Sequence, residues 1–201
     1  MRKTLSIFSY IFHPLLIPVM VTLFYFYFGT SYFLFKEIYI VIAQVVILTV
    51  IVPLLFFSLL YTLKRIDSIM IADINQRKIP LLIQFFLFFY LIKNIIRIEY
   101  FPELYFCILA SICSTFLAFI LLFIKQKASL HLLGISSFLT FVILLSLHTQ
   151  TNFIFWIVFL VLICGAVASS RLLLRAHNSR ELILGTLIGV IPQVTFGYFW
   201  V

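Results

Sequence analysis

The sequence is poor in charged residues, and acidic side chains are the scarcest of them. Only 10% of the 201 residues are charged, with 14 Lys and Arg against 6 Asp and Glu, while 65% are hydrophobic. A soluble globular domain is typically about 25% charged. The mean hydropathy of +1.25 is typical of an integral membrane protein. Because every polar stretch is short, we expect one integral membrane domain over residues 1–201 and no separate soluble domain.

Cysteines and paired carboxylates are also few. Cys107, Cys113 and Cys164 all fall inside apolar runs, which is typical of small packing residues and argues against a disulfide framework or a cysteine metal cluster. A phosphatase that depends on divalent metal ions needs several carboxylate ligands, and the sequence has no close acidic pair. We therefore expect neither a metal ion nor a cofactor.

Long apolar runs divide the chain into candidate membrane spans. A helix of about 20 residues crosses the hydrocarbon core of a bilayer, and the runs lack the apolar–polar alternation of membrane strands. The candidate spans are residues 10–28, 38–63, 81–96, 104–124, 132–148, 153–168 and 182–200. The sequence thus predicts an all-α, polytopic membrane helix bundle with seven transmembrane helices, or six if the short run 81–96 does not cross.

The parity of seven spans predicts which polar segments meet. If all seven spans cross the membrane, one face carries the N-terminus and segments 64–80, 125–131 and 168–181. The basic residues of this shared face are Arg2, Lys3, Lys64, Arg65, Arg77, Lys78, Lys125, Lys127, Arg171, Arg175 and Arg180, against Lys36, Lys93 and Arg97 on the other. The positive-inside rule makes the shared face cytoplasmic and the C-terminus external. We expect the inner, cytoplasmic membrane of a bacterium.

The shared face has the composition of an anion site. Its histidines and acids in segments 64–80, 125–131 and 168–181 are His131, His177, Asp67, Asp73 and Glu181. Arginine presents a planar fork of donors that matches phosphate oxygens, and lysine adds a point charge. We expect Arg77, Lys78, Lys127 and Arg171 to neutralise a phosphoryl group.

His177 and Glu181 are four residues apart, which places both side chains on one helical face. A carboxylate that accepts from one imidazole nitrogen fixes the tautomer and leaves a lone pair on the other, so His177 is a candidate nucleophile. Arg171 lies six residues earlier and would face elsewhere in one continuous helix. Its convergence with His177 requires a bend near Arg175 or at residues 178–179.

The second histidine, His131, follows Ser129 closely in Lys127-Ala128-Ser129-Leu130-His131, where a predicted span begins. An imidazole placed there is a candidate general acid for the leaving oxygen. His13, beside Pro14 at the opening of the first span, lies on the same predicted face and has no assigned role. His148 is interpreted as a boundary residue.

These residues resemble the motifs of the type 2 phosphatidic acid phosphatase superfamily of membrane lipid phosphatases. Its third motif, Ser-Arg, five residues, His, three residues, Asp, is matched by 170–181 with Glu181 in place of aspartate. Its Pro-Ser-Gly-His motif is matched in part by Ser129 and His131. Its first motif, a lysine followed by Arg-Pro, is matched poorly by Arg77-Lys78-Ile79-Pro80, because the upstream position falls near Met70 or Ile71.

The resemblance covers roughly residues 73–189 and implies a metal-independent phosphatase in which a histidine is transiently phosphorylated. It implies that His177 is the nucleophile, Glu181 its orienting carboxylate and His131 the general acid. The phosphoryl oxygens would be held by Arg77, Lys78, Lys127, Ser129, Ser170 and Arg171.

The site at the ends of apolar spans favours a phosphate carried by a lipid. Phosphatidate, phosphatidylglycerophosphate, a polyprenyl diphosphate and a phosphorylated lipid A all fit. We expect a lipid phosphate and membrane lipids as partners, and no nucleic acid. Two alternatives stay open: a catalytically inactive family member acting as a membrane scaffold, and a small transporter. The chain shows no clear internal repeat of the kind that transporters have.

Overall fold

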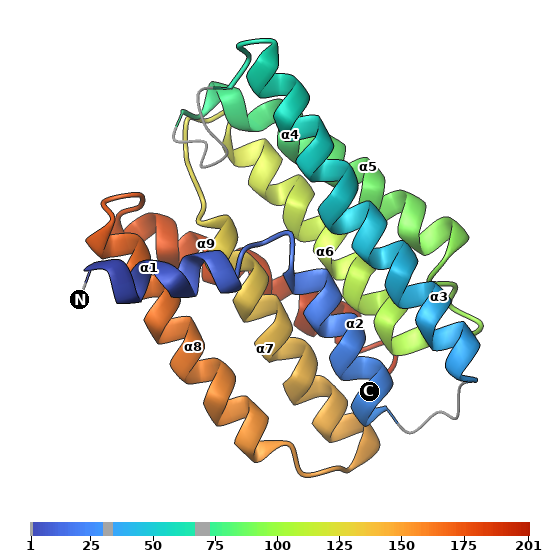
Figure 1. Ribbon diagram of the computed structural model, residues 1–201. Helices are drawn as coiled ribbons and strands as arrows, with labels where there is room; N and C mark the ends of the chain where they lie inside the picture. Colours follow the sequence, from blue (N-terminus) through green and yellow to red (C-terminus); the bar gives the residue numbers. More distant parts are fainter. Residues whose placement is uncertain (1, 30–33, 67–72) are drawn as a thin grey trace.

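The regular structure of the protein is helical throughout the residues described by the computed structural model, which are 2–29, 34–66 and 73–201 (Figure 1). The helices are α1 (Arg2–Ile11), α2 (Ile17–Phe28), α3 (Phe35–Val46), α4 (Val52–Thr62), α5 (Lys78–Asn94), α6 (Pro102–Leu121), α7 (Leu130–Thr149), α8 (Ile154–Leu173) and α9 (Ser179–Gly197). A π-helical turn, η1 (Ile47–Ile51), joins α3 to α4, and a 3-10 turn, η2 (Asn75–Arg77), leads into α5. The predicted all-α class is confirmed for these residues.

Four helical segments are long and apolar enough to cross a membrane. They are Phe35–Thr62, which combines α3, η1 and α4, and the helices α6, α7 and α8. Of the others, α2 has 12 residues and α5 has 17, while the 19 residues of α9 include Arg180, Glu181 and Gln193. The described residues therefore support an integral membrane protein, but six or seven spans are not confirmed.

The predicted first span, residues 10–28, is wrong as a single helix. α1 ends at Ile11 and α2 begins at Ile17, with His13 and Pro14 in the break. Proline disfavours the helical conformation at the residue before it and has no N–H to donate, which explains a break at this point. α1 packs against α8 and lies across the bundle instead of continuing α2 (Figure 1).

Helix α9 lies against α7 and α6. Gly185 makes the close approach to α7 possible, because a Cβ there would lie 2.5 Å from the carbonyl oxygen of Ser129. At the same place the Ser129 N–H donates to the carbonyl oxygen of Glu181 at 3.0 Å. The starts of α7 and α9, which carry His131 and Glu181, are thereby held in contact.

The polar segments of the predicted shared face meet at one end of the bundle. Besides the bond between the starts of α7 and α9, Arg77 donates to the carbonyl oxygen of Ala128 at 3.5 Å, and the hydroxyls of Ser9 and Ser170 are 2.7 Å apart. These contacts join α1, η2, the α6–α7 connection and the last turn of α8. The arrangement agrees with the grouping that parity predicts.

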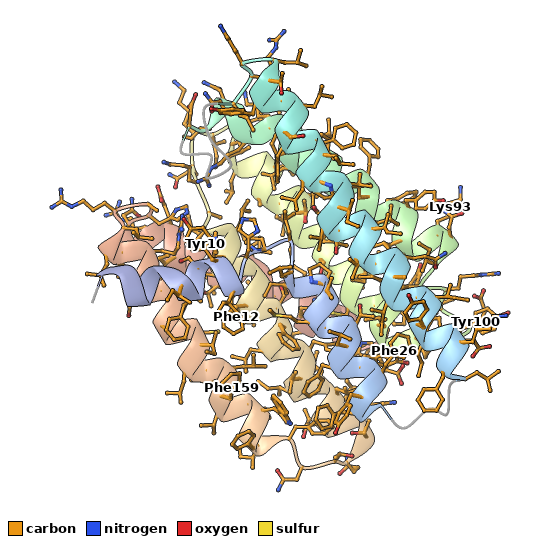
Figure 2. The ribbon with its side chains drawn as sticks, in the orientation of Figure 1. Tyr10, Phe12, Phe26, Lys93, Tyr100 and Phe159 are labelled. Carbon is orange, nitrogen blue, oxygen red and sulfur yellow. The ribbon has the colours of Figure 1, made fainter. Side chains whose placement is uncertain are left out.

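The opposite end has its own polar contacts. The Tyr25 hydroxyl donates to Glu103 at 2.8 Å, and a ring nitrogen of His148 lies 3.4 Å from the same carboxylate. Trp200 packs on the His148 ring, so the C-terminus lies at this end. Figure 2 shows Lys93 at the side of the bundle away from Tyr10.

Candidate active site

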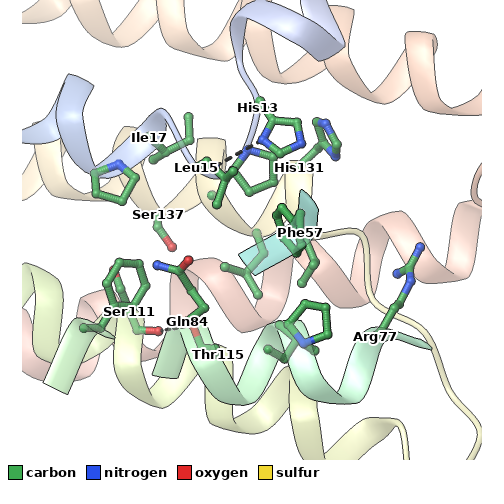
Figure 3. A pocket seen from close by; sticks show the side chains of 18 of the residues that line it. His13, Leu15, Ile17, Phe57, Arg77, Gln84, Ser111, Thr115, His131 and Ser137 are labelled. Atoms are coloured by element: carbon green, nitrogen blue, oxygen red, sulfur yellow. Dashed lines mark hydrogen bonds between the residues drawn. The ribbon is translucent and has the colours of Figure 1, made fainter. Parts of the chain in front are cut away.

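Four of the predicted site residues line one cavity of about 160 Å³ at the polar end of the bundle. They are Arg77, His131, Arg171 and His177. Figure 3 shows His131 and Arg77 on the cavity wall, together with His13 from the α1–α2 break. The cavity thus brings together the two histidines and the two arginines that the sequence predicted to converge.

The turn between α8 and α9 brings His177 back towards Arg171. Arg175 has a positive φ of 51°, and the Ala176 N–H donates to the carbonyl oxygen of Arg171 at 3.1 Å, which is a common way to end a helix. The Asn178 side chain then accepts from the Glu181 N–H at 2.9 Å and caps the start of α9. The structure has a bend at both of the predicted places.

His177 and Glu181 form the predicted pair. Nδ1 of the imidazole lies 2.6 Å from Oε2 of the carboxylate. A carboxylate only accepts, so Nδ1 carries the proton and Nε2 of the neutral ring keeps its lone pair. Burial lowers the pKa of His177 to about 4; the bond to Glu181 opposes this change, and the positive charges of Arg77 and Arg171 add to it. His177 is therefore neutral at physiological pH.

The Arg171 guanidinium is buried, and not all of its N–H donors are used. Its residue is only 5% exposed, and within the described part of the chain its Nε and Nη1 have no hydrogen-bond partner. The buried Ser129 hydroxyl has none there either. Arg77, 9% exposed, faces the same cavity, and burial lowers its pKa while the Glu181 carboxylate opposes the change. Leaving the buried Arg171 donors unpaired is costly, and an anion beside Arg171 would supply the missing acceptors.

His131 is held by α1. Its Nε2 lies 3.1 Å from the carbonyl oxygen of Ser9, and because a carbonyl only accepts, Nε2 carries a proton. Only Nδ1 of this ring is then left for another partner. The proton-donor role predicted for His131 therefore requires the ring to be charged and to use Nδ1.

The structure adds His13, which the sequence left without a role. Its ring packs edge-to-face on His131 with 5.3 Å between centroids, and its Nδ1 accepts from the Leu15 N–H at 3.3 Å. Burial, with Arg171 contributing, lowers the pKa of His13. The signals in the sequence were its position beside Pro14 and its place on the predicted shared face.

Other predicted phosphate ligands do not line the cavity. Ser170 is fully buried against Ser9, so its hydroxyl holds α8 to α1. The Lys78 ammonium lies over the Phe123 ring, 5.2 Å from the centroid. Consecutive helical residues point in different directions, so Arg77 lines the cavity and Lys78 does not.

Lys127 and Ser129 also lie outside the cavity lining, and Glu181 reaches it through His177. Asp67 lies outside the described residues.

The part of the chain described here brings no three His, Cys, Asp or Glu side chains together as a metal site. Comparison of the chain with models of known families, with curated proteins and with solved structures finds no match.

Proposed function

We propose that the protein is a membrane-embedded lipid phosphatase that hydrolyses a lipid phosphomonoester or diphosphate through a phosphohistidine at His177, without a metal ion. The observation that carries the proposal is the buried Arg171 guanidinium, two of whose donors have no partner among the described residues, on the same cavity as His177 with its Glu181 bond. The proposal includes membership of the type 2 phosphatidic acid phosphatase superfamily, on the motif resemblance alone.

In the first step, Nε2 of His177 attacks phosphorus and a P–N bond forms as the P–O bond to the lipid breaks. Glu181 keeps the proton on Nδ1 and stabilises the charge that develops on the ring. A phosphate dianion bound beside Arg171 favours the charged form of His131, which then gives its Nδ1 proton to the leaving oxygen. In the second step, water attacks phosphorus, His131 takes the proton back and phosphate leaves His177.

The two arginines supply electrostatic stabilisation. Arg77 and Arg171 line the cavity beside His177, where the phosphoryl oxygens gain charge in the transition state. Donors that are fixed and already dehydrated stabilise such charge most, because they need not reorganise during the reaction.

The remaining walls of the cavity favour a lipid. Beyond the charged end, the lining is mainly apolar and includes Ile17, Leu81 and Phe88. The outer surface of the helices is covered with exposed large apolar side chains, for example Phe35, Phe155 and Leu162, as a bilayer requires. A phosphate on a lipid whose chains stay in the membrane suits both features. On the charge bias of the sequence, the site opens to the cytoplasm.

A phosphate-release assay on the purified protein in detergent tests the proposal. The panel contains phosphatidate, phosphatidylglycerophosphate and a polyprenyl diphosphate, with a chelator present throughout. We expect turnover that persists in chelator, inhibition by vanadate and no turnover by His177→Ala. His148→Ala, at the opposite end of the bundle, is the matched control and should keep its activity.

Two results would contradict the proposal. Turnover that needs a divalent ion would exclude the metal-independent mechanism. The absence of turnover on every lipid phosphate would favour a membrane scaffold without catalytic activity.

A further inference from the structure

The cavity continues from the phosphate end into the apolar part of the bundle, and its wall there is not uniformly apolar. Gln84 of α5, Ser111 and Thr115 of α6 and Ser137 of α7 line it (Figure 3). Polar side chains at this depth in a membrane protein need hydrogen-bond partners, so each of them requires an explanation.

The three hydroxyls are already used within the protein. Ser111 donates to the carbonyl oxygen of Cys107 at 2.9 Å, and Thr115 donates to that of Ser111 at 2.8 Å. Ser137 donates to the carbonyl oxygen of Gly189 at 3.0 Å, which ties α7 to α9. These side chains are satisfied, and their role in the fold is accounted for.

Gln84 is different. Its side-chain amide makes no hydrogen bond with any of the residues that the structure describes, and Figure 3 shows it pointing into the cavity. Gln84 is half-buried, and its amide offers two donors and one acceptor to whatever occupies the cavity. The amide therefore lacks a partner that a bound molecule can supply.

The position of Gln84 defines which part of a bound lipid it meets. The cavity side of η2 and α5 carries four residues at helical spacing, Arg77, Leu81, Gln84 and Phe88. With a rise of 1.5 Å per residue, Gln84 lies roughly 10 Å along the axis from Arg77. A phosphate at Arg77 and Arg171 then leaves Gln84 beside the group that links the phosphate to the chains, with Phe88 deeper along the chain path.

We propose that the Gln84 amide donates to an ester carbonyl oxygen next to the phosphate-bearing carbon, so that Gln84 selects acylated lipid phosphates over isoprenoid phosphates. A polyprenyl chain has no carbonyl at this position and would leave the amide unpaired. Gln84 is a specificity residue in this account, and the reacting atoms are those described above. The inference rests on the proposed function insofar as it places a lipid phosphate at Arg77 and Arg171.

Two phosphatidates of equal chain length, one with ester links and one with ether links, isolate the carbonyl. The wild-type protein, Gln84→Leu and Gln44→Leu are compared by kcat/KM for both lipids. Gln44 is an exposed glutamine of α3 that does not line the cavity, so it is the matched control. One hydrogen bond predicts a preference of about fivefold for the ester lipid in the wild type and in Gln44→Leu, and no preference in Gln84→Leu. An equal preference in Gln84→Leu, or none in the wild type, overturns the inference.

A binding measurement separates this inference from the proposed function. Isothermal titration of the wild type and Gln84→Leu uses methylene phosphonate analogues of the two lipids, which bind but are not hydrolysed. If the wild type turns over no lipid yet binds the ester analogue about fivefold more tightly than the ether analogue, and Gln84→Leu does not, the proposed enzyme fails and the role of Gln84 is supported. Equal binding of both analogues by the wild type overturns the role of Gln84, whatever the turnover.

Discussion

Nδ1 of His177 lies 2.6 Å from a carboxylate oxygen of Glu181, one helical turn later. This contact holds the ring in one tautomer and directs the lone pair of Nε2 away from α9. It also links the pH dependence of the site to one carboxylate, because burial lowers the pKa of His177 to about 4 while the bond to Glu181 acts in the opposite direction.

The first prediction concerns pH. His177 attacks as the neutral ring, so activity is present above its pKa and is lost as pH falls through that value. We expect the acid limb of kcat/KM near pH 4, well below the ordinary histidine value of about 6.5. In Glu181→Gln the opposing contribution is lost, so the limb moves to lower pH while kcat falls. Both pH profiles are measured on the same lipid, so the ionisation of the substrate affects them equally and the difference between them reports on the protein. A limb that moves to higher pH in the variant would contradict the pairing.

The second prediction concerns Arg171. Arg171→Ala removes a buried donor to the phosphoryl oxygens and should lower kcat by about 100-fold or more. Arg171→Lys keeps the charge but not the planar fork and should recover only part of this loss. Arg180→Ala is the control, because Arg180 is exposed on α9 and does not line the cavity. Equal effects at the two arginines would show that net charge, and not the buried fork, matters.

The third prediction concerns the contact between α9 and α7. A side chain at Gly185 meets the backbone of Ser129, so Gly185→Val should lower the free energy of unfolding by about 1–3 kcal/mol and displace Glu181. Gly165 has no atom within 4 Å of an added Cβ, so Gly165→Val should be nearly neutral. Thermal unfolding of both variants in detergent, followed by the phosphate-release assay, makes the comparison. Equal stability of the two variants would contradict the close approach.

The fourth prediction concerns orientation. The C-terminus lies at the end of the bundle opposite the cavity, where Trp200 packs on His148. A reporter fused after Val201 should therefore report outside the cell if the site faces the cytoplasm. An N-terminal fusion, at the cavity end, is the paired control and should report inside. The reverse pair of signals would place the site on the external face.

The sequence predicted the helical class and the grouping of the polar segments because both follow from the order of apolar runs and polar segments along the chain. Spacing also predicted the His177–Glu181 contact, since i and i+4 side chains meet on any helix. The break between α1 and α2 was missed because apolar residues continue on both sides of Pro14. That break sends α1 across α8 and brings His13 next to His131.

The roles of single polar residues depended on packing that spacing does not encode. Ser170 matches the motif in sequence, yet its hydroxyl is turned towards Ser9 of a distant helix. Lys78 adjoins Arg77 but lies over Phe123. Gln84 received no role from the sequence, because only the folded structure shows that this residue lines the cavity.

Detection of the phosphorylated histidine tests the central claim most directly. Wild-type protein is mixed with a lipid phosphate labelled with radioactive phosphorus and quenched in alkali within the first turnover. The account predicts label on the protein that survives alkali, is lost in acid and is absent from His177→Ala. Turnover without any labelled protein, or label that persists in His177→Ala, would contradict it.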